Sequence, residues 1–128
     1  MRIKLTSIMV DDQDKARRFY TDVLGFRKKH DIPVGEFKWL TVVSPEGPDD
    51  IELSLEPNAN PAAKAFQEAM FTQGIPLAAF EVSDIQGEYA RLLQHGVAFT
   101  REPTRAGPVI IAIMSDTCGN LIQLYQLA

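Results

Sequence analysis

The sequence predicts an α+β domain built from two tandem βαβββ modules. The length of 128 residues is typical of a single domain. Strand and helix signals follow the same order in both halves of the chain. In addition, the pair of motifs Val10-Asp11-Asp12 and Leu24-Gly25-Phe26 is repeated as Val82-Ser83-Asp84 and His95-Gly96-Val97. An internal repeat of this kind indicates two copies of one supersecondary unit.

The first module is expected over residues 1–57. Ile3 to Val10 alternates as a strand, and Asp11-Asp12 can cap a helix that Gly25 ends. The helix has an apolar stripe at the spacing of helical turns, made of Ala16, Phe19, Tyr20, Val23 and Leu24. Three strands complete the module, at residues 26–31, 36–44 and 51–56, with turn residues at 33–35 and 45–50.

The remaining chain is expected to form a linker with one helix at 58–74 and a second module at 75–128. Asn60 can cap the linker helix, Pro61 suits its first position, and Gly74 can end it. In the second module, Ser83-Asp84 precedes a helical stripe that stops at Gly96. Its strands are expected at residues 77–82, 97–101, 109–114 and 121–126, with loops at 103–108 and 116–120.

Composition excludes several classes of protein. The hydrophobic share of 45% and the charged share of 23% are typical of globular domains, and the net charge of −4 gives no reason to expect nucleic acid binding. No apolar run reaches the roughly 18 to 20 residues that span a bilayer, and the start lacks the features of a signal peptide. The one cysteine, Cys118, excludes an internal disulfide and a multi-thiolate zinc site. We expect a cytoplasmic protein.

Three runs resemble the vicinal oxygen chelate superfamily, which includes glyoxalase I, extradiol dioxygenases, fosfomycin-resistance transferases and bleomycin-binding proteins. They are Val10 to Phe26, Phe80 to Asp84, and Asp116 to Leu124, and they stand in the family's order along essentially the whole chain. The resemblance implies the glyoxalase/bleomycin resistance/dihydroxybiphenyl dioxygenase fold, a curved mixed sheet around a groove. It also implies a homodimer. It says little about function, because the superfamily carries many chemistries on one scaffold.

The resemblance also implies where a metal would be held. Metal-dependent relatives use two histidines on the first strands of the two modules and two carboxylates on the last strands. The matching runs place Leu5 and Leu77 at the histidine positions, and Glu52 and Gln123 at the carboxylate positions. Leucine has no donor atom and glutamine is a poor substitute for a carboxylate, so we expect no metal and no other cofactor.

Strand alternation predicts a groove lining that is partly apolar, partly aromatic and partly polar, as is usual for a small-molecule pocket. On the strand at 36–44, either the face of Phe37, Trp39 and Thr41 or the opposite face, which carries Lys38, lines the groove. If Glu52 is buried without a metal, its pKa should be raised; alternatively, Glu52 is an edge carboxylate paired with a nearby lysine or arginine. The predicted lining residues are Leu5, Ser7, Phe37, Trp39, Thr41, Glu52, Leu77, Ala79, Gln123 and Tyr125.

The leading hypothesis is a protein that binds a small, partly aromatic molecule without a metal. The alternative is a glyoxalase-like lyase or isomerase, or a dioxygenase-related enzyme, with Glu52 as its base or its sole retained metal ligand. A third hypothesis is an interaction module whose groove a partner subunit fills. Among other candidates, His30 could reach the groove rim, whereas His95 and Cys118 fit structural positions better.

Overall fold

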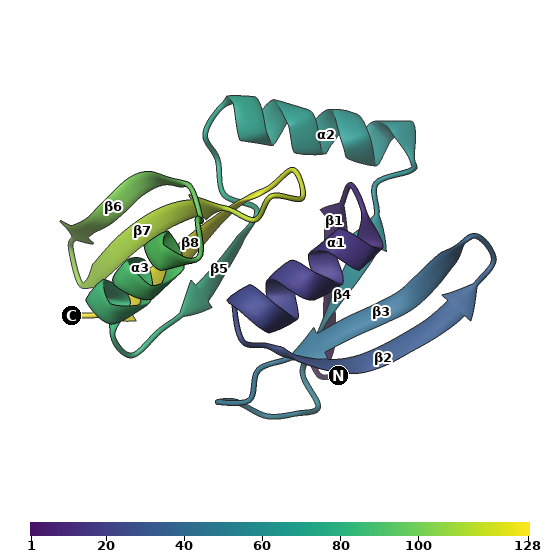
Figure 1. Cartoon of the computed structure of the whole chain (residues 1–128), viewed down its shortest axis with the longest axis horizontal. Coiled ribbons are helices and arrows are strands. Elements are labelled where there is room, and N and C mark those ends of the chain that lie inside the picture. The colour runs from purple at the N-terminus through teal and green to yellow at the C-terminus, as the bar shows by residue number, and fades with distance from the viewer. The chain divides into compact units, whose positions relative to one another are not determined.

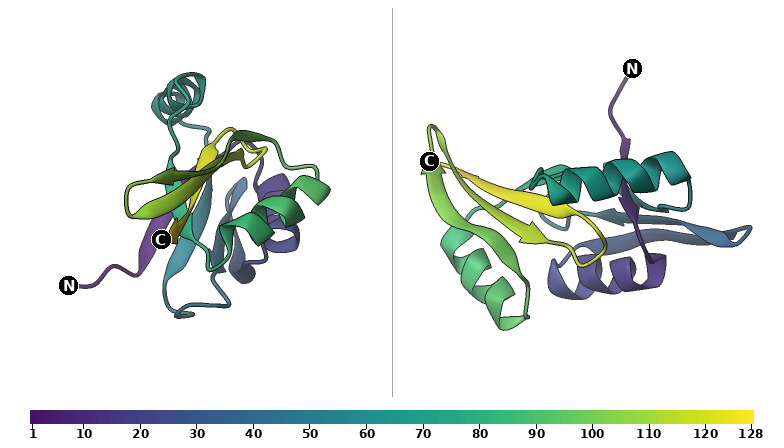
Figure 2. Two further views of the ribbon diagram at one scale, coloured as in Figure 1. Left: turned by 90° about the vertical axis from the view of Figure 1, so that its left-hand side faces the viewer. Right: turned by 90° about the horizontal axis from the view of Figure 1, so that it is seen from above.

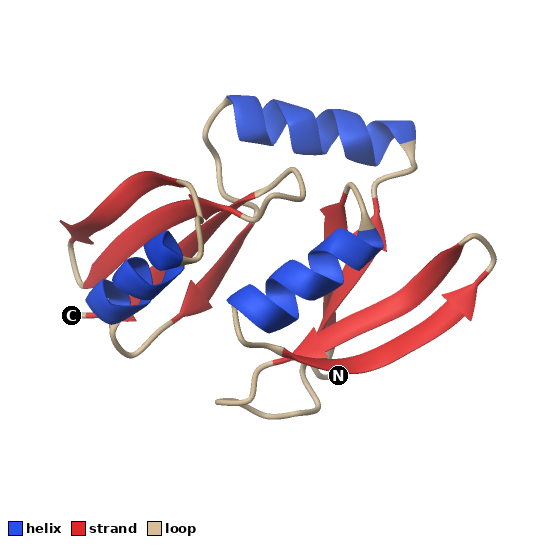
Figure 3. Cartoon of the chain, in the orientation of Figure 1, coloured by secondary structure: helices blue, strands red, loops and turns tan.

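A computed structural model describes residues 1–128 of the chain as two compact units, Met1–Phe66 and Gln67–Ala128. Each unit holds one four-stranded mixed sheet (Figures 1 and 3). In each unit a helix lies against one face of its own sheet (Figure 2). The prediction of an α+β fold with two βαβββ modules is therefore confirmed.

The first unit contains four strands in the order β1-β4-β3-β2, with β1 parallel to β4 and the other neighbours antiparallel. Its helix continues from a regular α1 into a π-helical turn, η1. The elements are β1 (Leu5–Val10), α1 (Gln13–Arg18), η1 (Phe19–Val23), β2 (Arg27–Val34), β3 (Phe37–Val43) and β4 (Glu52–Pro57).

The predicted limits of this helix have a clear local cause. The Asp12 carboxylate accepts a hydrogen bond from the Lys15 amide at 3.0 Å and so caps the first turn. At the other end Gly25 has a φ of +87°, the left-handed conformation that ends helices and that glycine adopts without strain. The π-helical turn was not predicted. It is closed by a hydrogen bond from the Leu24 amide to the Phe19 carbonyl.

Alternation along the strands divides the first sheet into a covered and an uncovered face. The side chains on the covered face are buried together with Ala16, Phe19 and Tyr20 of the helix, and they form the core of the unit. These strand residues are Ile8, Val10, Leu40, Val42 and Leu55. The residues between them along the strands point to the opposite face, which no helix of the unit's own βαβββ module covers.

The second unit repeats the topology, with strand order β5-β8-β7-β6 and β5 parallel to β8. Helix α2 begins in the first unit and ends in the second. The elements are α2 (Pro61–Thr72), β5 (Ala78–Glu81), α3 (Ile85–Gln94), β6 (Phe99–Ala106), β7 (Val109–Ser115) and β8 (Leu121–Leu127). The buried residues Ile85, Leu92, Ala112, Met114, Ile122 and Leu124 form its core.

One loop prediction in the second unit is wrong. Residues 103–108 were expected to be a loop, but β6 continues to Ala106 and only Gly107 and Pro108 turn the chain. Pro103 is tolerated because β6 is an edge strand, where a missing amide donor costs no ladder bond. The pairing with β7 is irregular at this point, between Arg101 and Thr104.

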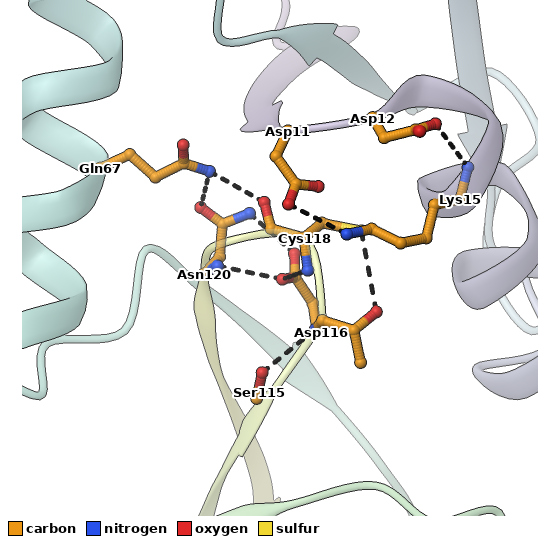
Figure 4. Close-up of polar contacts among 9 residues, drawn as sticks. Asp11, Asp12, Lys15, Gln67, Ser115, Asp116, Cys118 and Asn120 are labelled. Atoms are coloured by element: carbon orange, nitrogen blue, oxygen red, sulfur yellow. Dashed lines mark hydrogen bonds and ion pairs between the residues drawn. The ribbon is translucent and has the colours of Figure 1, made fainter.

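A buried polar network organises the turn between β7 and β8 (Figure 4). The Asp116 carboxylate accepts hydrogen bonds from the amides of Cys118 at 2.7 Å and Asn120 at 3.0 Å. Its second oxygen accepts one from Asn120 Nδ2 at 2.7 Å. The side-chain Nε2 of Gln67 on α2 donates to Asn120 Oδ1 at 3.0 Å and to the backbone carbonyl of Cys118 at 3.2 Å. The network therefore ties the second half of α2 to this turn.

No buried side-chain nitrogen or oxygen lacks a hydrogen-bond partner. A buried polar group without a partner would lower the free energy of unfolding by about 1 to 3 kcal/mol. The hydrogen bonds of the buried polar groups are therefore a condition for the stability of this small core. None of the three helices has the length and apolar character needed to cross a membrane.

Candidate functional site

Strand register brings the predicted lining residues of the first unit onto one face of its sheet. Leu5 lies beside Glu52, and Ser7 beside Ser54. Thr41 lies on the other side of Ser54, so Thr41, Trp39 and Phe37 share that face. Lys38 points to the opposite face, where its Nζ lies 2.6 Å from Asp14 Oδ1 of α1. The Lys38 side chain therefore lies on the face opposite to that of Phe37, Trp39 and Thr41.

In the second unit the predicted residues Ala79, Gln123 and Tyr125 lie on one face of the sheet. Ala79 lies beside Gln123, and Glu81 beside Tyr125, on the face opposite to the buried Ile122 and Leu124. Leu77 precedes β5 and donates its backbone amide to the Leu121 carbonyl at 2.9 Å.

A hydrogen-bonded cluster occupies the uncovered face of the first sheet. Glu52 Oε1 lies 2.7 Å from Thr41 Oγ1 and 2.7 Å from His30 Nδ1. The His30 imidazole stacks on the Trp39 indole, with ring centroids 4.1 Å apart and planes within 11°. A register shift in β2 between Lys28 and His30 accompanies this placement. His30 therefore belongs to the cluster on this face of the sheet.

The prediction of a raised pKa for Glu52 is wrong. The hydrogen bond from Thr41 is the main cause of a pKa below the usual glutamate value, and the hydrogen bond and charge of His30 and the charge of Lys29 add to the effect. Burial acts in the opposite direction and is outweighed. The carboxylate is therefore ionised at neutral pH and is a weak proton acceptor.

Because its pKa is lowered in the folded state, the Glu52 carboxylate stabilises the folded protein at pH values above its unfolded pKa of about 4.3. This contribution is lost as the pH falls through the folded pKa. Glu52→Gln should therefore lower the free energy of unfolding at pH 7, and the gap to the natural protein should narrow at pH 3. Urea unfolding at both pH values measures the gap. Glu46→Gln, in the exposed turn before β4, controls for the loss of one carboxylate. A gap that stays constant or widens on acidification would contradict the prediction.

A pocket of about 580 Å³ lies on the same face, between the sheet and the start of α2. Its walls are largely apolar and aromatic. They are formed by Met9, Val34, Phe37, Lys38, Trp39, Ser54, Glu56, Pro57, Asn60, Ala62 and Ala63. Of the predicted lining residues, Phe37 and Trp39 line this pocket, whereas Thr41 and Glu52 lie next to it in the cluster with His30.

The end of the β3–β4 ladder forms one side of this pocket. Paired residues are Val42 with Leu53 and Thr41 with Ser54, and the pairing goes no further. Beyond this ladder, the side chain of Gln13 bridges the two strands. Its Nε2 donates to the backbone carbonyls of Lys38 at 2.9 Å and Leu55 at 2.8 Å, and its Oε1 accepts from the backbone amide of Lys38 at 3.0 Å. One side chain of α1 thus replaces the missing backbone pairing, so the strands can separate without leaving polar groups unpaired.

The donor set does not fit the metal that the fold family implies. In the first unit the hydrocarbon side chain of Leu5 stands beside Glu52, and the Glu52 oxygen is already held by Thr41 and His30. No group of three or more His, Cys, Asp or Glu side chains is arranged to hold a metal ion.

Two contributors to the site were missed at the sequence level. Glu56 could have been found, because it continues the alternation of Glu52 and Ser54 along β4. Gln13 gave no such signal, since its role depends on bonds to residues that are remote in the sequence. His95 lies at the end of α3 as expected, and Cys118 is buried in the network of Figure 4.

Comparisons with known proteins identify the family of the chain. The model of the Glyoxalase/Bleomycin resistance protein/Dioxygenase superfamily matches residues 2–124. The uncharacterized protein YurT of Bacillus subtilis (strain 168) is 56% identical over 126 residues, covering 98% of this chain and 99% of YurT. A lactoylglutathione lyase of Salmonella typhimurium (strain LT2) is 28% identical, covering 98% of this chain and 93% of the lyase.

Among solved structures, TnmS3, an antibiotic binding protein from Streptomyces sp. CB03234, is similar with a TM-score of 0.79. It is 29% identical, and the match covers 100% of this chain and 97% of TnmS3. The family match spans nearly the whole chain, and both βαβββ modules are present. The chain therefore belongs to the glyoxalase/bleomycin resistance protein/dioxygenase superfamily.

Proposed function

We propose that this protein binds a small, partly aromatic molecule on the uncovered face of its first sheet, without a metal. The observation that carries the proposal is the pairing of a pocket of about 580 Å³ with two exposed aromatic side chains. Phe37 and Trp39 are 41% and 40% exposed although they lie on a sheet face. Exposed aromatic rings beside a concave apolar surface are typical of ligand sites.

The stack of His30 on Trp39 supports the proposal. Trp39 lines the pocket while the imidazole holds the plane of its indole ring, and Glu52 and Thr41 in turn hold the imidazole. A ring fixed before binding loses little conformational freedom when a planar ligand stacks on it. The likeness to an antibiotic binding protein, TnmS3, supports a small-molecule ligand.

The proposal includes a homodimer in the cytoplasm. The edge strand β1, with the exposed Leu5, is a surface that a second copy can cover. Sedimentation of the purified chain tests the assembly independently of any ligand.

A thermal-shift screen of planar and aromatic compounds tests the binding function. A ligand that binds only the folded state raises Tm, and the rise grows with the logarithm of the ligand concentration above its Kd. It should also change the fluorescence of Trp39, which is the one tryptophan of the chain. A broad screen in which no compound moves either signal would refute the proposal.

A second candidate function is a lyase or isomerase reaction at the Glu52–His30 pair. The observation in its favour is the 2.7 Å contact between Glu52 Oε1 and His30 Nδ1, because a carboxylate can orient an imidazole for proton transfer. The likeness to a lactoylglutathione lyase points the same way. Wherever turnover is found, Glu52→Gln should reduce kcat, and an unchanged rate would exclude this candidate.

A further inference from the structure

The charges around the pocket of the first unit are unbalanced. Two charged residues, Lys38 and Glu56, contribute to its lining. The ammonium group of Lys38 is engaged by Asp14 on the opposite face of the sheet, 2.6 Å away, so Lys38 offers mainly its backbone to the pocket. Glu56 forms no ion pair in the structure. The pocket therefore has one carboxylate that no cation of the chain neutralises.

Glu56 belongs to the same surface as the aromatic rings. It lies beside Met9 in the β1–β4 pairing, two positions from Ser54 on β4, and it lines the pocket together with Phe37 and Trp39. The faces of aromatic rings carry partial negative charge and attract cations, and tryptophan attracts them more strongly than tyrosine or phenylalanine does. The carboxylate and the rings thus favour the same sign of charge in a ligand. The other polar groups of the lining, Ser54 and Asn60, are neutral.

We infer that the ligand is an aromatic amine: a planar ring system that carries a protonated nitrogen, with the ring against Trp39 and Phe37 and the ammonium group at Glu56. This inference rests on the proposed binding function and specifies its ligand. The negative net charge of the chain, −4, works in the same direction, since it attracts cations over a longer range. The cluster of Glu52 with His30 and Thr41 holds Trp39 in place and is not the anchor for the ammonium group.

Three probes of one shape separate charge from hydrophobicity: 1-naphthylmethylamine, which is cationic at pH 7, the neutral 1-naphthylmethanol, and the anionic 1-naphthylacetate. Isothermal titration of the full chain at pH 7 and low salt measures their affinities. The amine should bind about tenfold more tightly than the alcohol, and the acetate more weakly than the alcohol. Raising the salt concentration should reduce the preference for the amine.

The variant Glu56→Gln keeps the shape of the side chain and removes its charge. It should bind the amine and the alcohol about equally, so the preference of the natural protein for the amine is lost. The matched control Glu46→Gln, in an exposed turn outside the pocket, should behave as the natural protein does. Urea unfolding of each variant verifies that the fold is intact.

The outcomes distinguish the inference from the proposed function. Equal binding of amine and alcohol by the natural protein, or a preference for the amine that persists in Glu56→Gln, overturns the aromatic amine while binding stands. The same holds if all three probes fail and an uncharged or anionic compound binds in the screen. Failure of the probes together with failure of every screened compound overturns both.

Discussion

Asp116→Ala is expected to lower the free energy of unfolding by about 3 to 5 kcal/mol. The carboxylate is fully buried and accepts three hydrogen bonds, two from the backbone amides of Cys118 and Asn120 and one from Asn120 Nδ2. Alanine leaves these donors in the protein interior without their acceptor. Because a domain of this size is stable by only about 5 to 15 kcal/mol, the loss should be visible as a large shift of the urea midpoint.

Two further variants make this prediction specific to the network. Asp116→Asn retains one oxygen for the backbone amides but places an amide nitrogen against Asn120 Nδ2, so about 1 to 2 kcal/mol should be lost. Asp49→Ala, in the exposed turn between β3 and β4, should change the free energy of unfolding by less than about 0.5 kcal/mol. A loss for Asp116→Ala no larger than that of Asp49→Ala would contradict the role given to the network.

The order of elements could be predicted because local residues determine it. Helix limits follow from side chains and backbone within one turn, as the Asp84 carboxylate and the Gly87 amide show, with 3.0 Å between donor and acceptor. The left-handed glycines Gly25 and Gly96, with φ of +87° and +78°, end the two helices for the same local reason. Alternation also predicted that Trp39 and Thr41 share one face of β3, since a strand has a period of two, but it did not decide between this face and the face of Lys38.

The electrostatics of the site could not be predicted in this way. Glu52 was assigned the wrong direction of pKa shift because alternation indicates burial but not hydrogen-bond partners. His30 reaches Glu52 from an edge strand that pairs irregularly with β3, and local sequence gives no rule for such a register shift. The role of the Gln13 side chain could not be predicted for the same reason, because its partners Lys38 and Leu55 are identified by tertiary structure alone.

Trp39→Ala should weaken binding of a planar ligand by about 30-fold, the equivalent of about 2 kcal/mol, because aromatic anchors dominate the energy of such sites. The indole is 40% exposed, so its removal should change the free energy of unfolding much less than loss of a core aromatic ring would. Binding is measured by isothermal titration with the best compound of the screen, since the variant has no tryptophan to report by fluorescence.

The comparison with two other aromatic variants decides what the loss of affinity means. Trp39→Phe keeps a ring against His30 and should recover most of the affinity, whereas Phe71→Ala, on the far half of α2 and 43% exposed, should leave it unchanged. If Trp39→Ala and Phe71→Ala bind equally well, the ligand does not stack on the uncovered face of the first sheet. The pocket beside Trp39 would then be a surface for protein packing. The third hypothesis, an interaction module whose groove a partner subunit fills, would become the one to test.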